Sequence, residues 1–209
     1  MQRYTRTLRD LGYLEQDPFT RRYALNHRVL DLSFSYLRKN PLIERAAPIL
    51  IDLRRTARER VDLSIPDGLD LVFVLRLQSK RETFAAALIG RRVPLAISAG
   101  GRAILAGLPD DEVQEILDRS TLHPNTPRTK TDRNTILNEI AVARAKGYAV
   151  QSEEWRLGEI VTAAAIVDRD GRPVAAVHIA ASTNEWSREA FEKKFSPQAA
   201  AAAAQDISP

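Results

Sequence analysis

Few side chains in this sequence have the types and spacing that catalysis requires. Ser98, His178 and Glu153 could supply the hydroxyl, imidazole and carboxylate of a hydrolytic triad, but no nucleophile-elbow motif surrounds the serine. Glu153 and the adjacent Glu154 would point in different directions on an extended backbone, so they make a poor acid–base pair. The sequence therefore gives little support to an enzyme.

The sequence gives no better support to a metal site or a nucleotide site. His27, His123 and His178 are too scattered along the chain to predict a metal centre. There are no cysteines, which excludes thiolate ligands and disulfides. Neither of the usual glycine-rich nucleotide loops, GxxxxGKS and GxGxxG, is present. We expect no metal and no cofactor.

The segment 93–106 carries a pattern that is weak by itself but compatible with a small-ligand site. A β-friendly run ends there, Gly100 and Gly101 would let the backbone turn tightly, and an apolar-periodic helix begins. The free N–H groups of a helix start favour an anion, and the glycines leave room for a carboxylate or carbonyl group. An ordinary strand-to-helix connection is the alternative interpretation.

His178 and Trp155 each allow two interpretations. Strand alternation places His178 on the same face as Ala176 and Ala180, where small side chains leave a hollow. It is either a satisfied core histidine or a donor to a ligand in that hollow. Trp155 is either a core aromatic residue or the lid of a pocket.

The elements that would position these residues form one α/β domain from about residue 42 to 209. Strands are predicted at 61–65, 71–77, 84–89, 148–151, 160–167 and 174–181. Helices are predicted after the two glycines, at about 108–119 with Pro109 in the first turn, at 132–147 and from Ser187 through the alanine run. Hairpins rather than βαβ repeats predict an antiparallel sheet with packed helices and argue against a Rossmann sheet.

The N-terminal part has a different organisation. A helix at 2–11 and two short strands at 13–16 and 21–25 are typical of the recognition helix and wing of a winged helix-turn-helix. A connecting helix at 26–39 and a second helix at 42–58 follow. We interpret the Arg54-Arg55 and Arg58-Glu59-Arg60 cluster as a solvated helix end. The N-terminal arginines could contact nucleic acid, or they could form only a solvated face.

Composition sets the wider limits. The 209 residues are 44% hydrophobic and 28% charged, with a net charge of +4, which suits one substantial core plus a smaller appendage. No apolar run approaches the length of a membrane span, and the N-terminus lacks the apolar region of a signal peptide. We therefore expect a cytoplasmic protein.

Several blocks of residues together resemble the IclR-type transcriptional regulators. Residues 6–15, 22–25 and 29–32 look like the end of that family's DNA-binding domain and its linker. Blocks at 94–95, 101–106, 147–149, 153–158 and 171–176 look like its effector-binding domain. The resemblance covers nearly the whole chain and rests on the order and spacing of the blocks.

The resemblance implies a division into three parts. They are a partial winged helix-turn-helix (1–26), a linker helix (27–41) and a GAF-like effector-binding domain (42–209). It also implies a homodimer or homotetramer that binds a small metabolite and thereby changes how paired DNA-binding domains fit an operator. Arg102 and residues 186–189 resemble the subgroup that responds to aromatic acids and β-ketoadipate-pathway intermediates.

The resemblance assigns roles to particular residues. The implied effector contacts are Ile97, Ala99, Gly100, Gly101, Gln151, Glu153, Trp155, Val161, Ala163, His178 and Ala180. The implied DNA contacts are Gln2, Arg3, Tyr4, Arg6, Arg9, Arg21 and Arg22. The family's DNA-binding domain has two further helices and a strand before the position of Met1. A start assigned too late, a shortened chain, or a stand-alone ligand-binding relative without DNA binding would each account for this.

Overall fold

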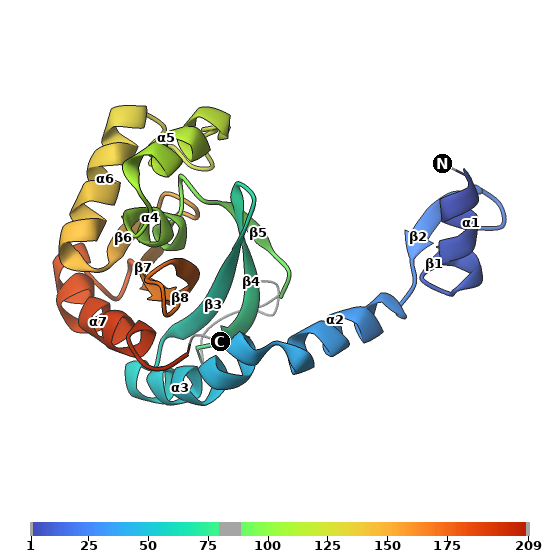
Figure 1. Ribbon diagram of the computed structural model, residues 1–209, viewed down its shortest axis with the longest axis horizontal. Helices are drawn as coiled ribbons and strands as arrows, with labels where there is room; N and C mark the ends of the chain where they lie inside the picture. Colours follow the sequence, from blue (N-terminus) through green and yellow to red (C-terminus); the bar gives the residue numbers. More distant parts are fainter. Residues whose placement is uncertain (1, 80–88, 208–209) are drawn as a thin grey trace. The chain divides into compact units, whose positions relative to one another are not determined.

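The computed structural model describes residues 2–79 and 89–207 (Figure 1). The chain divides into two compact units, Met1–Asn40 and Pro41–Pro209. This division falls next to the predicted start of the effector domain at residue 42. The finer division of the first unit at residue 26 stays a prediction.

The first unit contains the predicted helix and wing. Helix α1 (Gln2–Asp10) precedes an antiparallel pair of short strands, β1 (Leu14–Gln16) and β2 (Tyr23–Leu25). Asp17 closes the turn between them, because its Oδ1 accepts the N–H groups of Phe19 and Thr20 at 2.9 and 2.6 Å. Helix α2 (Val29–Lys39) follows, and none of its residues is buried within the chain.

The second unit is built on a six-stranded sheet in the order β5-β4-β3-β8-β7-β6. The strands are β3 (Arg60–Asp67), β4 (Asp70–Leu77), β5 (Arg92–Pro94), β6 (Ala149–Ser152), β7 (Glu159–Val167) and β8 (Pro173–Ser182). All five pairings are antiparallel, as predicted. The strand predicted at 84–89 lies outside the described residues except for Ile89, which is in a turn.

Helices cover both faces of this sheet (Figure 1). They are α3 (Pro41–Ala57), α4 (Ala99–Ala106), α5 (Asp110–Arg119), α6 (Arg133–Lys146) and α7 (Arg188–Ala203). Thr162 of β7 bonds to Ser196 of α7 at 2.8 Å, whereas the next residue, Ala163, packs in one cluster with Ala103 of α4. Because successive strand residues point to opposite faces, α7 and α4 lie on opposite sides of the sheet.

The predicted helix boundaries are largely confirmed. Asp132 caps α6 by accepting the N–H of Thr135 at 2.8 Å, and Gly147 ends this helix with φ +76°. Ser187 caps α7, which runs through most of the alanine tract. Pro109 differs from the prediction, because it is the N-cap of α5 rather than a residue of its first turn. Within the described ranges, no helix combines the length and apolarity that crossing a membrane requires.

Candidate functional site

Gly100 and Gly101 lie inside the first turn of α4, so the predicted tight turn at these glycines is wrong. Ser98 is the N-cap, and its Oγ accepts the N–H of Gly101 at 3.2 Å. Close packing explains the glycines instead. A Cβ on Gly101 would lie 1.8 Å from the carbonyl oxygen of Leu95, and one on Gly100 would lie 2.2 Å from Cε1 of His178. The glycines therefore let α4 pack directly on its neighbours.

The N–H groups at this helix start are mostly engaged within the chain. The N–H of Ala99 is donated to Oε1 of Gln151 at 2.8 Å, and that of Gly101 to Ser98. The anion site predicted from the helix start thus loses two of its donors.

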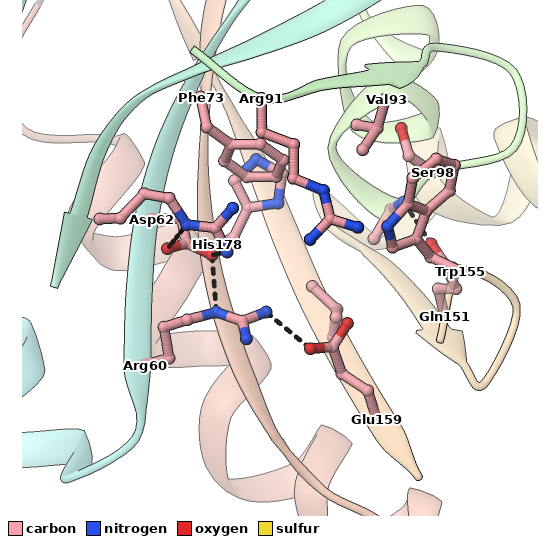
Figure 2. A pocket seen from close by; sticks show the side chains of 13 residues that line it. Arg60, Asp62, Phe73, Arg91, Val93, Ser98, Gln151, Trp155, Glu159 and His178 are labelled. Atoms are coloured by element: carbon pink, nitrogen blue, oxygen red, sulfur yellow. Dashed lines mark hydrogen bonds and ion pairs between the residues drawn. The ribbon is translucent and has the colours of Figure 1, made fainter. Parts of the chain in front are cut away.

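A cavity of about 40 Å³ lies beside the start of α4, on the sheet face that α4 covers (Figure 2). A single water needs roughly 10–15 Å³ of such space, so the cavity has room for a few water molecules. Its lining consists of Arg60, Asp62, Phe73, Arg76, Arg91, Val93, Ser98, Ala99, Gln151, Trp155, Glu159, Val161 and His178. Five predicted effector contacts are among them: Ala99, Gln151, Trp155, Val161 and His178.

The other six predicted effector contacts lie outside this lining. They are Ile97, Gly100, Gly101, Glu153, Ala163 and Ala180. Ile97 and Ala163 are buried in the hydrophobic cluster around α4, and Ala180 pairs with Val161 across β7 and β8. Glu153 forms an ion pair with Arg128 and accepts the N–H of Gly158 at 2.9 Å.

Sequence reasoning missed a buried ionic group on this face. Arg60 Nε lies 2.9 Å from Asp62 Oδ2, and its Nη2 lies 2.8 Å from Glu159 Oε1. Arg76 Nε lies 3.2 Å from the other oxygen of Asp62. Only 5% of the Arg60 side chain is exposed, so the prediction that Arg60 belongs to a solvated helix end is wrong. It is the first residue of β3 and faces the cavity.

Burial governs the titration of this ionic group. It raises the pKa of Asp62 and lowers the pKa of Arg76, while the attraction between the two groups opposes both shifts. Burial also lowers the pKa of His178 to about 3, helped by the positive charges of Arg76 and Arg60. His178 is therefore neutral at pH 7.

His178 fits the first of its two predicted interpretations, and its role as a donor to a ligand stays a prediction. Its Nε2 lies 2.7 Å from Ser64 Oγ, and its ring packs 5.2 Å from that of Phe73. It is thus a satisfied core histidine on the side of Ser64. Its ring also lines the cavity, beside that of Phe73 in Figure 2.

Three cavity residues have unused binding capacity within the described part of the chain. Arg76 Nη1 and Trp155 Nε1 are buried donors without a hydrogen-bond partner there. Arg91 lies over the Trp155 ring, 5.4 Å from its centroid, and pairs with no carboxylate of residues 2–79 or 89–207. Buried donors without a partner are costly. A ligand with acceptor oxygens would satisfy them.

The predicted DNA contacts all belong to the first unit. Gln2, Arg3, Tyr4, Arg6 and Arg9 are on α1, and Arg21 and Arg22 lie at the tip of the wing, before β2. Tyr4 is 76% exposed, and the Arg6 side chain is 78% exposed beside Asp10. Their role in DNA binding stays a prediction.

Known proteins resemble this chain over most of its length. Residues 34–209 match the family model described as "Bacterial transcriptional regulator IclR C-terminal". The chain is 29% identical to the Pca regulon regulatory protein of Pseudomonas putida over 198 residues, which cover 94% of this chain and 67% of that protein.

Solved structures agree with the sequence comparison. The transcriptional regulator RHA06195 from Rhodococcus sp. RHA1 superposes with a TM-score of 0.82 at 35% identity, covering 97% of this chain and 80% of that chain. The IclR structure of Thermotoga maritima superposes with a TM-score of 0.81 at 27% identity, covering 96% of this chain and 81% of that chain.

The fold and these similarities define a transcriptional regulator with a C-terminal effector-binding domain. The chain belongs to the IclR family of bacterial transcriptional regulators. The resemblance and the fold class predicted from the sequence are both confirmed. Regulators of this family bind small-molecule effectors and DNA.

Proposed function

We propose that the cavity beside α4 is the effector site of this regulator and that its effector is a small organic carboxylate. The observation that carries the proposal is the set of unused donors on Arg76, Arg91 and Trp155. Hydrogen bonds from guanidinium groups to a carboxylate are charge-assisted and roughly twice as strong as neutral ones. Asp62 and Glu159 already engage Arg60, which leaves Arg76 Nη1 and Arg91 for the ligand.

Aromatic side chains favour an effector with a flat ring. Phe73 and Trp155 line the cavity from two elements, and aromatic rings stack well on one another. An aromatic ring needs more space than the cavity volume of about 40 Å³, so we expect Arg91 to change its rotamer when the effector binds.

A panel of paired compounds tests the carboxylate proposal. Pyruvate, succinate and benzoate would each be compared with the neutral amide by thermal unfolding of the full chain. A ligand at about 100 times its Kd stabilises the folded state by about 2.7 kcal/mol, which raises the Tm of a domain of this size by roughly 5–10 °C. We expect at least one carboxylate to act and its amide to have no effect. Equal effects of acid and amide would refute the proposed effector class.

We further propose that the first unit supplies the DNA contacts, through Arg3, Arg6, Arg9, Arg21 and Arg22. These arginines lie on α1 and the wing, the two elements that enter the groove and touch phosphates in winged helix-turn-helix proteins. Replacing one phosphate-contacting arginine should weaken binding to the promoter DNA of its own gene and reduce the salt slope by about 1. A salt slope that is unchanged in all five variants would contradict this assignment.

Three broader expectations belong to the same proposal. The protein would bind its effector without transforming it, so benzoate should be recovered unchanged after prolonged incubation. It would act in the cytoplasm as a homodimer or homotetramer. The exposed apolar side chains of Leu30, Leu32 and Phe34 on α2 support self-association, and sedimentation equilibrium would show a monomer if the proposal of an oligomer is wrong.

A further inference from the structure

A buried ion pair lies directly beneath the loop that carries Trp155. The guanidinium of Arg102, on α4, donates to both oxygens of the Glu154 carboxylate, at 3.0 and 2.7 Å. The Arg102 side chain is fully buried and that of Glu154 is 2% exposed. Neither residue lines the effector cavity, yet Glu154 is the sequence neighbour of a residue that does.

A second segment holds the backbone of the same loop. Thr126 Oγ1 donates to the carbonyl of Glu153 at 2.6 Å, and Thr129 Oγ1 donates to that of Glu154 at 2.5 Å. Asn125 donates to the carbonyl of Trp155. Three consecutive carbonyls are therefore fixed, and with them the backbone position from which the indole extends.

Lys130 and Glu139 extend the buried pair. The N–H of Lys130 donates to Glu154 Oε2 at 3.3 Å, while its Nζ bonds to Glu139 Oε1 at 2.5 Å. Glu139 Oε2 lies 3.9 Å from Nη1 of Arg102. The Glu154 carboxylate thus links α4, the segment before α6, and α6 itself to the Trp155 loop.

Helix α4 also fixes the start of this loop. The N–H of Ala99 holds the side chain of Gln151, and Arg102, one turn further along the same helix, holds Glu154. Both ends of the stretch before Trp155 are thereby attached to one rigid element. Buried ion pairs contribute little net stability compared with apolar packing, so precise placement of the loop is the better explanation of this one.

We propose that Arg102 and Glu154 are positioning residues for effector binding: the pair holds the Trp155 ring against the cavity and so sets effector affinity without touching the effector. Only the expected effect on effector affinity rests on the proposed function. The ring position itself can be measured on the empty protein.

The test uses Trp155 as the reporter. A W186F background leaves Trp155 as the single tryptophan, and E154Q and the double variant R102M/E154Q are made in it. The double variant guards against loss of folding, because it removes both charges and leaves no unpaired buried guanidinium. The control is E192Q. Glu192 lies on α7, is partly buried and pairs with Lys146 of α6, and neither residue lines the cavity.

Acrylamide quenching and benzoate titration are the two readouts. We expect the quenching constant of Trp155 to rise at least about twofold in both Glu154 variants and to stay unchanged in E192Q. The Kd of benzoate should rise about tenfold or more, in line with the sensitivity of binding sites to small misplacements.

Several results would overturn the proposal. They are an unchanged quenching constant in folded Glu154 variants, an equal rise in E192Q, or failure of both Glu154 variants to fold, which would make the pair a folding requirement. If benzoate binds none of the proteins, the carboxylate proposal fails for this probe, while the quenching result still decides the positioning role.

Discussion

The buried, neutral His178 should make the second unit less stable in mild acid. Its pKa in the folded protein is about 3, because of burial and the nearby charges of Arg76 and Arg60, against about 6.5 in an unfolded chain. Below pH 6.5 the unfolded state binds a proton that the folded state excludes, so stability falls as the pH drops from 6.5 toward 3. Above pH 6.5 the effect is absent. At pH 5 the expected loss is about 2 kcal/mol.

Urea unfolding at pH 7.5 and pH 5 measures this loss. The comparison is between the wild type and H178N, because asparagine is close to histidine in size, can still bond to the Ser64 hydroxyl and does not titrate. Trp155 and Trp186 both belong to the second unit, so their fluorescence reports its unfolding. Between the two pH values, the wild type should lose about 2 kcal/mol more than H178N.

The contributions of the other titratable groups to the pH dependence of stability cancel in this comparison. His27, His123, Asp62 and Glu159 are present in both proteins. Equal losses of stability in the wild type and in H178N would refute the reasoning. They would mean that His178 accepts a proton in the folded state despite its burial.

Three substitutions test the packing and capping arguments by thermal unfolding. G101A should cost about 3 kcal/mol or more, because its Cβ would lie 1.8 Å from the Leu95 carbonyl oxygen; a near-neutral result would disprove the close packing of α4. G147A should cost only about 1 kcal/mol, because its φ of +76° is unfavourable for alanine but nothing lies within 4 Å of the new Cβ. S187A should cost about 1 kcal/mol, because it removes the acceptor for the Ala190 N–H at the start of α7, and an unchanged Tm would contradict that role.

Local rules predicted the elements of this fold well. Asp132 and Gly147 bound α6 by capping chemistry that is visible in the sequence. The hairpin between β7 and β8 follows from two apolar runs on either side of the polar turn at 168–172, in which Gly171 has φ +78°. Such features depend on neighbours within a few residues, so no tertiary information is needed to find them.

The ionic part of the pocket could not be predicted in the same way. Arg60 pairs with Glu159, which is 99 positions away in the sequence, and only the sheet order brings β3 and β7 to either side of β8. The alternation of Arg60, Asp62 and Ser64 with apolar residues was present in the sequence. Such alternation normally indicates a face in water, whereas here it marks a face enclosed by α4.

The segment around Gly100 and Gly101 lies beside the cavity, but the tight turn predicted at these glycines is wrong. The start of α4 borders a cavity, an arrangement that the family resemblance implied and that the sequence pattern alone left open. The pattern could not show that Gly100 and Gly101 serve packing against His178 and Leu95, because those neighbours come from a different strand and from the preceding connection. We therefore assign the donors for the ligand to arginine side chains, in place of the backbone N–H groups expected from the sequence.

Calorimetric titration of benzoate into R91Q and R92Q tests the central claim most directly. Arg91 lines the cavity without a carboxylate partner in the described ranges, whereas its neighbour Arg92 pairs with Asp67 and Asp70 at 2.7 and 3.1 Å and lies outside the lining. Loss of one charged hydrogen bond should raise the Kd for R91Q about tenfold or more. The Kd for R92Q should stay within about twofold of the wild type. An unchanged Kd for R91Q would contradict a carboxylate effector held by this pocket.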